Sequence, residues 1–146
     1  IYLGSQAFFA GDDGAADSVD GGDGVDRLSY ADADLGVVLN LANQALNDGA
    51  AVGDRIRGIE ILVASTYDDS IAGSSARDEI YGGASDDSLN GGSGNDWLSG
   101  DGGADELTGG AGVDDFVLER DEVGFGDTYW PGDLIADYAR ASDNLA

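Results

Sequence analysis

Hydrophobic and polar positions repeat with a period of nine along residues 64–117. In six consecutive units, position eight is a large apolar residue and position six is an aspartate. The apolar residues are Ile71, Ile80, Leu89, Leu98, Leu107 and Phe116, and the aspartates are Asp69, Asp78, Asp87, Asp96, Asp105 and Asp114. Glycines gather at positions one, two and four. A fixed period of this kind predicts stacked structural repeats rather than a catalytic pocket.

Each unit divides, by this pattern, into six turn-like residues followed by three strand-like residues. Because glycine adopts backbone conformations that other residues resist, the GGxG start predicts a tight turn with inward carbonyls. Alternation along the short strand places position eight in a core and positions seven and nine on the surface. A strand this short must stack on copies of itself. The block therefore predicts an all-β fold.

The nine-residue pattern also occurs before residue 64, in a less regular form. The unit 21–29 (GGDGVDRLS) matches completely and has Asp26 at position six, whereas 12–20 matches only in part. Residues 55–63 return to the frame with Glu60 in place of aspartate. Between these units, residues 35–41 (LGVVLNL) favour a β-strand followed by a polar loop.

Three parts follow from this division of the chain. Residues 1–54 form a short irregular N-terminal part with degenerate coils, one full repeat and an inserted strand and loop. Residues 55–117 form the repeat stack. Residues 118–146 have the acidic and aromatic composition of a C-terminal cap, which a repeat stack needs over its last apolar layer. The chain begins without methionine and the cap stops abruptly, so we expect a piece of a longer protein.

Charge narrows the functions open to this fold. Thirty acidic residues face six arginines, giving a formal net charge of −24. This balance excludes the basic footprint of nucleic-acid binding and opposes attraction to anionic membranes. It is compatible with a disordered acidic chain, a salt-adapted protein or a cation-binding protein. A 42% share of hydrophobic residues, periodically spaced, argues against disorder, and the self-repulsion of the acids indicates a cation ligand.

Missing residue types exclude most catalytic sites. Without histidine, cysteine or lysine, the chain cannot form a serine–histidine triad, a thiol nucleophile, an ordinary zinc site or a Schiff base. Paired-carboxylate chemistry remains formally open. Since the regularly placed aspartates are better explained by cation binding, we expect no enzyme activity in this chain, although its parent protein can be an enzyme. No stretch is long and apolar enough to span a membrane.

Calcium fits the spacing of the acids. It takes six to eight oxygen ligands at roughly 2.3–2.6 Å, and stacked parallel strands lie about 4.8 Å apart. An ion midway between two turns is then displaced about 2.4 Å along the stack from each. Two aspartates supply part of that shell, and peptide carbonyls of the glycine turns must supply most of the rest. Magnesium is less suited because it requires a smaller, regular octahedron.

The pattern GGxGxDxUx, present in 21–29, 91–99 and 109–117, resembles the RTX (repeats-in-toxin), hemolysin-type family of calcium-binding nonapeptides. The flanks are similar to those of RTX modules in serralysin-type proteases and mannuronan epimerases. The resemblance implies a right-handed parallel β-roll, a β-solenoid with two nonapeptides per coil. It also implies Ca²⁺ between turns eighteen residues apart, with about four or five ions in the main stack.

The resemblance further implies which residues bind calcium. On one edge it pairs Asp69 with Asp87 and Asp87 with Asp105; on the other it pairs Asp78 with Asp96 and Asp96 with Asp114, with Glu60–Asp78 weaker. The acids implied as ligands are Asp26, Glu60, Asp69, Asp78, Asp87, Asp96, Asp105 and Asp114. The glycines are Gly73, Gly82, Gly83, Gly91, Gly92, Gly94, Gly100, Gly103, Gly109, Gly110 and Gly112.

Some assignments stay open at this point. Asp127, Asp133 and Asp137 are either further calcium ligands in the cap or ordinary loop acids. The first unit departs most from the family pattern, with Ala64, Ser65 and Tyr67 at positions where glycine is expected, and the partner turn of Asp26 cannot be identified.

The resemblance implies a calcium-binding module of an exported bacterial protein. Such a chain would stay unfolded in the cytosol, pass through a type I secretion channel and fold on calcium outside the cell or at its surface, supporting its parent. The alternative is a polysaccharide- or partner-binding module of an adhesin, surface layer or epimerase. On the roll, Tyr81, Trp97 and Val117 would share an outer face with Ile61 and Val63. The segment 35–41 is the expected cover of that face; a ligand is the other possibility.

Overall fold

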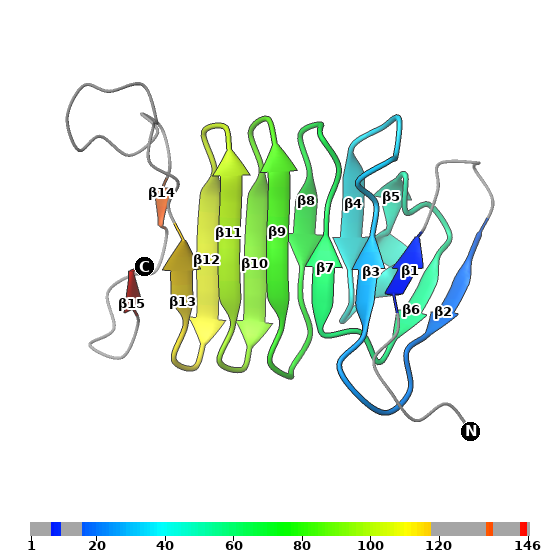
Figure 1. Ribbon diagram of the computed structural model, residues 1–146, viewed down its shortest axis with the longest axis horizontal. Coiled ribbons are helices and arrows are strands. Elements are labelled where there is room, and N and C mark those ends of the chain that lie inside the picture. Colours follow the sequence, from blue (N-terminus) through cyan, green and yellow to red (C-terminus); the bar gives the residue numbers. More distant parts are fainter. Residues whose placement is uncertain (1–6, 10–15, 118–133, 136–143, 146) are drawn as a thin grey trace.

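The computed structural model describes residues 7–9, 16–117, 134–135 and 144–145, with side chains for 16–117 (Figure 1). Up to residue 63 the elements are β1 (Ala7–Phe9), β2 (Ser18–Asp20), β3 (Arg27–Ser29), β4 (Val37–Asn40), the 3₁₀ helix η1 (Gln44–Leu46), β5 (Asp48–Gly49), β6 (Arg55–Arg57) and β7 (Ile61–Val63). After it come β8 (Ser70–Ala72), β9 (Glu79–Ala84), β10 (Ser88–Ser93), β11 (Trp97–Gly102), β12 (Glu106–Ala111), β13 (Asp115–Val117), β14 (Leu134–Ile135) and β15 (Asn144–Leu145).

Two long sheets run along the molecule, and successive strands of the repeat alternate between them. One sheet has the strand order β1-β3-β7-β9-β11-β13-β15, and the other has β14-β12-β10-β8-β4-β5. The strands pair in parallel in both sheets except for the antiparallel pair β4–β5. Figure 1 shows these strands side by side along the long axis. The chain is therefore all-β with parallel sheets, as predicted.

Each strand of the repeat pairs with the strand two units away rather than with the next one. Ser70 of β8 pairs with Ser88 of β10, which pairs with Glu106 of β12, and Glu79 of β9 pairs with Trp97 of β11. Each step is eighteen residues, the same separation that joins the backbone of Asp87 to the side chain of Asp105. Because the stride is twice the sequence period, position-six residues lie on two separate edges of the stack.

Strands β9 to β12 are longer than the expected three residues. Each has six residues, running through positions seven to nine and on through positions one to three of the next unit. The division into six turn residues and three strand residues is therefore wrong for these strands. Glycines at positions one and two still pair in the parallel ladder, as in Gly92–Gly110, although both of these glycines have positive φ. The turn proper is confined to the residues before position six.

The core is a column of single apolar side chains, one from each unit. The position-eight residues Ile71, Ile80, Leu89, Leu98, Leu107 and Phe116 are at most 2% exposed. Leu28, Leu39 and Leu62 continue the column toward the N-terminus. Positions six and one also face inward, since their residues are buried throughout units 73–117. Each position-six carboxylate thus lies under the turn, at the margin of the core.

The inserted segment forms a strand, as its sequence predicts, and takes a place in the second sheet. Leu39 of β4 pairs with Ile71 of β8, and the polar residues that follow form η1 and β5. The expectation that segment 35–41 covers the outer face of Ile61, Val63 and Tyr81 is wrong. Strand β4 instead lies between β8 and β5 in the six-stranded sheet, where its backbone pairs with both neighbours.

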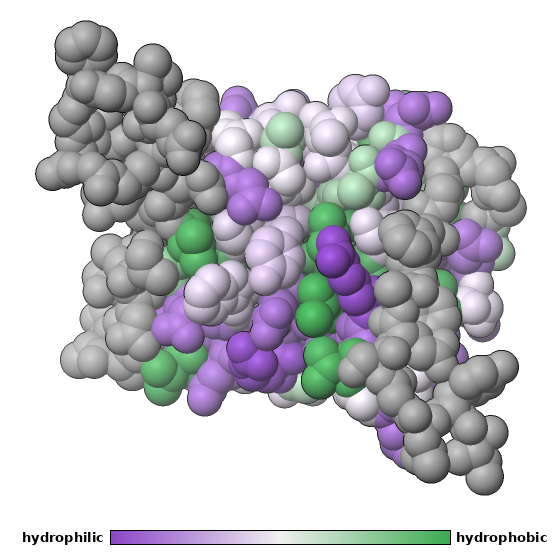
Figure 2. Space-filling view, viewed as in Figure 1, coloured by the Kyte–Doolittle hydropathy of each residue, from purple (hydrophilic) through white to green (hydrophobic). Residues whose placement is uncertain are grey.

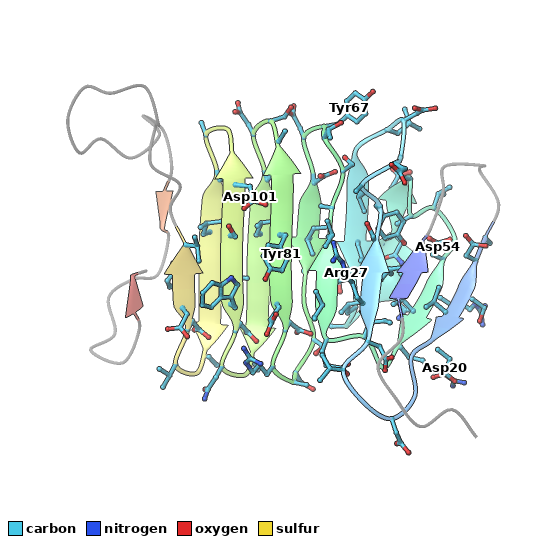
Figure 3. All side chains as sticks on the ribbon, viewed as in Figure 1. Asp20, Arg27, Asp54, Tyr67, Tyr81 and Asp101 are labelled. Carbon is cyan, nitrogen blue, oxygen red and sulfur yellow. The ribbon has the colours of Figure 1, made fainter. Side chains whose placement is uncertain are left out.

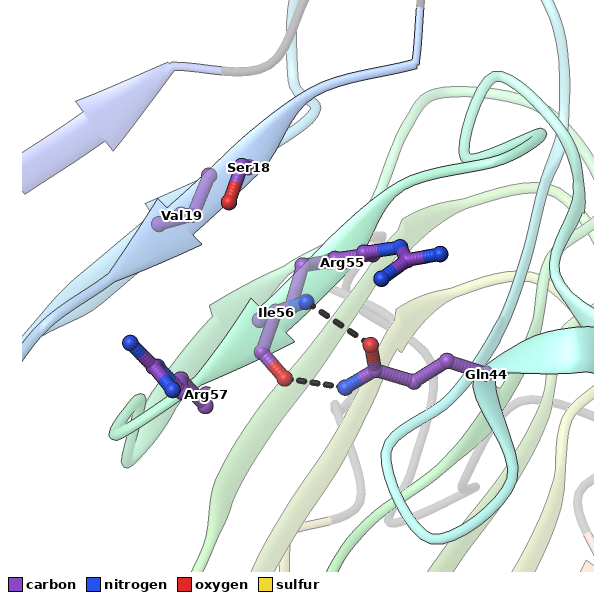
Figure 4. A pocket seen from close by; sticks show the side chains of 6 residues that line it. All are labelled: Ser18, Val19, Gln44, Arg55, Ile56 and Arg57. Atoms are coloured by element: carbon purple, nitrogen blue, oxygen red, sulfur yellow. Dashed lines mark hydrogen bonds between the residues drawn. The ribbon is translucent and has the colours of Figure 1, made fainter.

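At the N-terminal end the roll opens, and a side chain bridges the gap (Figure 4). Strand β6 pairs with β2 in a separate two-stranded sheet. The side-chain amide of Gln44 donates to the carbonyl of Ile56 and accepts from its N–H, the latter at 3.0 Å. A pocket of about 350 Å³, lined by Ser18, Val19, Gln44, Arg55, Ile56 and Arg57, lies between these elements. The side-chain amide of Gln44 thus makes the two backbone hydrogen bonds with Ile56 that a neighbouring strand would otherwise make.

Candidate metal centre

The position-six aspartates of the repeat are buried, although each carries an ionisable carboxyl group. Their exposed fractions are 4% for Asp69, 3% for Asp87 and 1% for Asp78, Asp96, Asp105 and Asp114. Asp26 of the earlier unit is 0% exposed. Burying a carboxylate is costly unless it is hydrogen-bonded or coordinates a metal. The partners of these oxygens therefore decide what the turns can do.

In four of these aspartates, one carboxylate oxygen accepts from the backbone N–H of the aspartate eighteen residues earlier. On one edge, Asp69 N–H donates to Asp87 Oδ1 at 2.8 Å, and Asp87 N–H donates to Asp105 Oδ1 at 2.9 Å. On the other edge, Asp78 N–H donates to Asp96 Oδ1 at 2.9 Å, and Asp96 N–H donates to Asp114 Oδ1 at 3.0 Å. The four pairs inferred from the family resemblance are thus adjacent in the stack.

The second oxygen of two of these carboxylates has no protein partner. Asp87 Oδ2 and Asp96 Oδ2 are buried without a hydrogen bond. Burial raises the pKa of Asp87 to about 8 and that of Asp96 to about 6, and the neighbouring aspartates on each edge add to the rise. A buried acceptor without a donor is rare in native proteins and indicates an ion or water at that point.

The glycine at position one of these units lies directly against the same carboxylate oxygen. A Cβ at Gly82 would lie 2.4 Å from Asp87 Oδ2, and a Cβ at Gly91 would lie 2.4 Å from Asp96 Oδ2. Gly100 and Gly109 stand in the same relation to Asp105 and Asp114, at 2.1 and 2.4 Å. A side chain at position one would therefore occupy the place next to the carboxylate. Glycine at this position keeps the site open.

Positions two and four of the later turns adopt a left-handed backbone. The glycines in this conformation are Gly83, Gly92, Gly94, Gly103, Gly110 and Gly112, with φ between 93° and 156°. Ser85 at position four (φ 76°) and Asp101 at position two (φ 62°) adopt it as well and are the only non-glycine residues that do so in the described part of the chain. We call the segments 82–87, 91–96, 100–105 and 109–114, each of which spans the end of a strand and the turn after it, the glycine turns.

The first two turns of the repeat are built differently. Ser65 and Ser74 stand at position two, and Tyr67 and Ala76 at position four, all without positive φ. Ser65 donates to Asp69 through both N–H and Oγ, each at 2.8 Å. Ser74 donates to Asp78 Oδ2 through N–H at 2.7 Å and Oγ at 3.0 Å. In residues 65–69 and 74–78, which we call the serine turns, the serine thus donates two hydrogen bonds to the carboxylate of its own turn.

The partner turn of Asp26 is now identified as that of Glu60. Asp26 N–H donates to Glu60 Oε2 at 2.9 Å, because β3 pairs with β7. The separation is 34 residues, since the insertion lies between the two turns. Glu60 N–H donates to Asp26 O at 3.2 Å rather than to the next coil, and Asp78 Oδ1 is left buried without a partner. The ladder along this edge is interrupted between Glu60 and Asp78.

Sequence reasoning missed a second, exposed ladder at position five. Asp68 Oδ1 accepts from Asp86 N–H at 3.3 Å, Asp86 Oδ1 accepts from Ala104 N–H at 2.9 Å, and Asn95 Oδ1 accepts from Val113 N–H at 3.0 Å. It also missed the serine contacts. Two sequence features could have revealed these contacts. Aspartate or asparagine at position five indicates the exposed ladder, and serine at position two indicates the serine contacts.

The donor set fits a hard cation bound mainly by backbone oxygens. Throughout the part of the chain that the structure describes, no group of three or more acidic side chains is placed to hold a metal ion by itself. Buried single carboxylate oxygens beside glycine turns instead suit an ion that accepts carbonyl and carboxylate oxygen, as calcium does. Asp127, Asp133 and Asp137 lie outside the described residues. Gly73 lies against Asp78, whose Oδ2 is 2.7 Å from where its Cβ would be.

Comparison with known proteins agrees with this geometry. The model of the RTX calcium-binding nonapeptide repeat family matches in overlapping copies at residues 56–89, 63–98 and 81–116. No curated protein matches the chain. Within the described residues, no helix has the length and hydropathy to cross a membrane. The matches together span residues 56–116, and this part of the chain is similar to the RTX calcium-binding nonapeptide repeats.

Proposed function

We propose that this chain is a calcium-folded module of an exported bacterial protein, in which the glycine turns hold the ions. The fold proposed is a right-handed roll with two nonapeptides per coil, for which the eighteen-residue register is the support. The ligands on one edge are Asp87 and Asp105, and those on the other are Asp96 and Asp114, together with turn carbonyls. About four or five ions would fill the main stack.

The observation that carries this proposal is the pair of partnerless oxygens, Asp87 Oδ2 and Asp96 Oδ2. They occur at equivalent places on the two edges, and each has its other oxygen fixed by a backbone N–H. A cation supplies the missing partner and neutralises like charges stacked along each edge. Asp26 and Glu60 offer a further candidate site of lower regularity, since Gly22 and Gly24 in that turn also have positive φ.

Calcium dependence would suit a protein that crosses the cell envelope unfolded. When metal binds only the folded state, binding and folding are one equilibrium. Other extracellular calcium modules bind in the range of about 10⁻⁴–10⁻³ M. With that affinity the glycine turns would stay empty in the cytosol and fill after secretion, in which case the module stabilises its parent outside the cell. A C-terminal cap would complete the stack, for which the pairing of β14 with β12 and of β15 with β13 is the support.

Equilibrium dialysis against calcium tests the binding claim directly. We expect about four or five ions per chain, with magnesium at the same concentration displacing few of them. A chain that binds no more calcium than an unstructured acidic peptide of equal charge would overturn the proposal. Titration of released protons gives a second readout, because buried carboxyl groups must ionise to bind metal.

A polysaccharide-binding role is the second candidate, favoured by one groove on the seven-stranded sheet. Arg27, Ile61, Val63, Tyr81 and Asp101 line a space of about 350 Å³. Figure 3 labels Arg27, Tyr81 and Asp101, and Figure 2 shows apolar patches among hydrophilic residues on this side of the molecule. A sugar ring stacked on Tyr81 with polar groups at both ends would fit such a groove.

Glycan-array binding in calcium separates the two candidates. Loss of a hit in Tyr81→Ala, with no loss in Tyr67→Ala on a turn, would support the groove. Tyr67 is 46% exposed and does not line it, which makes it a matched control. An array without hits would leave the calcium module as the sole function of these residues.

A further inference from the structure

The serine turns and the glycine turns satisfy equivalent carboxylates in different ways. We propose that Ser65 and Ser74 take the place of a cation, so that the first coil of the repeat forms without metal and provides the edge on which the glycine turns then assemble. This inference rests on the proposed function, because it assumes that the glycine turns require calcium. On this proposal, Ser65 and Ser74 determine which turns of the repeat bind metal.

Asp69 has a complete set of protein partners. Its Oδ1 accepts from Val37 N–H at 2.6 Å and from Ser65 Oγ at 2.8 Å, and its Oδ2 accepts from Ser65 N–H at 2.8 Å. Ser65 itself is 1% exposed. A cation at this carboxylate would have to displace existing hydrogen bonds from groups that are already buried. This carboxylate therefore has donors on both oxygens without a metal ion.

Only one oxygen of the Asp78 carboxylate has hydrogen-bond donors. Its Oδ2 accepts from Ser74 N–H and Oγ, whereas its Oδ1 is open because Glu60 N–H binds Asp26 instead. In the glycine turns the arrangement is reversed, since Oδ1 of Asp96 is bonded and Oδ2 is open. The N–H and hydroxyl of Ser74 thus occupy the oxygen that corresponds to the open one in Asp96. At Asp69 the N–H of Ser65 occupies it.

A second buried carboxylate in the N-terminal part is also satisfied internally. Asp54, 2% exposed, accepts from Tyr30 OH at 2.7 Å and from Asp17 N–H at 2.8 Å. Tyr30 is 1% exposed and fills an inward position with a large side chain. The elements β4, β6 and β8 therefore adjoin carboxylates, those of Asp54 and Asp69, with a protein donor on each oxygen, whereas β10 and β11 follow carboxylates with one open oxygen.

The metal-independent coil meets the glycine turns through the same ladder. Asp69 N–H donates to Asp87 Oδ1, and Asp78 N–H donates to Asp96 Oδ1. Strands β8 and β7 present their edges to β10 and β9. Because the N–H groups of Asp69 and Asp78 are already held in place, the first two glycine turns have only to order their own residues around calcium. This reduces the conformational entropy that is lost on assembly.

Amide hydrogen exchange of the full chain in chelator tests this inference. We expect amides of residues 55–81 to exchange at least about tenfold more slowly than those of residues 82–117, with calcium then protecting both. The double variant Ser65→Ala/Ser74→Ala should lose the protection of 55–81 in chelator and regain it in calcium. Ser88→Ala is the control, because Ser88 is exposed at a strand position and should change neither state.

A conservative double variant guards against a general loss of folding. Ser65→Thr/Ser74→Thr keeps both hydroxyl groups and should keep the protection in chelator. Equal exchange of 55–81 and 82–117 in the unmodified chain, or equal loss of protection in the alanine and threonine variants, would overturn the inference. Failure to bind calcium at all would refute the proposed function instead, and the exchange pattern in chelator would still decide the role of the serines.

Discussion

Asp78 donates its backbone N–H to Oδ1 of Asp96, eighteen residues later, at 2.9 Å. Asp96 repeats the contact with Asp114 at 3.0 Å. Each such bond holds one oxygen of a carboxylate in place and leaves the other beside the glycine at position one of its unit. In the folded stack the ladder therefore fixes one oxygen of each carboxylate, and the other oxygen is the one that the proposed calcium site would use.

Asp96→Asn should weaken calcium binding while keeping the ladder. The amide oxygen can still accept from Asp78 N–H, but the charge beside Gly91 is lost. Since calcium affinity depends on ligand charge, we expect a loss of about tenfold or more at the sites that share this residue. Isothermal titration calorimetry measures it.

The control for this variant is Glu106→Gln, which removes the same charge from an exposed position. It should leave the titration nearly unchanged. If both variants weakened calcium binding equally, net charge alone would explain the affinity, and the assignment of Asp96 as a ligand would be wrong.

Gly94→Ala should destabilise the calcium-bound roll by about 1–3 kcal/mol. The residue has φ 137°, and a Cβ there would lie 2.3 Å from the carbonyl oxygen of Ala76. Gly102→Ala is the matched comparison, since the nearest atom that its Cβ would meet is Gly83 O at 3.8 Å. Thermal unfolding in excess calcium should show a lower Tm for the first variant only; similar Tm values would refute the backbone argument.

Ser85→Gly should stabilise the roll by up to about 1 kcal/mol, because it removes a side chain from a left-handed backbone position. Ser85 has φ 76° and makes only an exposed hydrogen bond to Thr66 O. Ser93→Gly, in a strand without positive φ, should destabilise instead. Denaturant unfolding in calcium distinguishes the signs, and a loss of stability in Ser85→Gly would contradict the prediction.

Acid should favour order in the calcium-free protein. Burial raises the pKa of Asp87 to about 8 and of Asp96 to about 6, from an ordinary 3.8. The folded state then binds more protons than the unfolded state between about pH 4 and 8, so its stability falls as the pH rises through that window. Circular dichroism in calcium-free buffer should show more β-structure at pH 5 than at pH 8.

Calcium should reverse the sign of this pH dependence, because it binds the ionised carboxylates. We expect calcium affinity to increase from pH 5 to pH 8. A calcium-free protein that becomes more ordered with rising pH would show that these carboxyl groups are not buried as the structure has them.

The sequence was sufficient for the strand content, the parallel sheets and the column of apolar residues. Period and residue type alone place Leu89 and Leu98 inside, since a nine-residue unit with one apolar side chain has few other ways to bury it. They do not reveal that Asp87 and Asp96 are buried as well. The adjacency of Asp87 and Asp105 followed from the family resemblance, because the period does not distinguish a stride of nine from one of eighteen.

The N-terminal part could not be predicted in the same way. The pairing of Asp26 with Glu60 spans an insertion whose length breaks the period. Gln44 binds the backbone of Ile56 across a gap between sheets, a contact that depends on tertiary placement alone. The role of Ser65 depends on which oxygen of Asp69 it reaches, and side-chain geometry of that kind is absent from the repeat pattern.

Far-UV circular dichroism of the full chain, recorded in chelator and again after calcium addition, tests the central claim most directly. The account predicts a large, saturable gain of β-structure on calcium addition, above a smaller signal that persists in chelator and is reduced in Ser65→Ala/Ser74→Ala. A spectrum that is the same with and without calcium would contradict it.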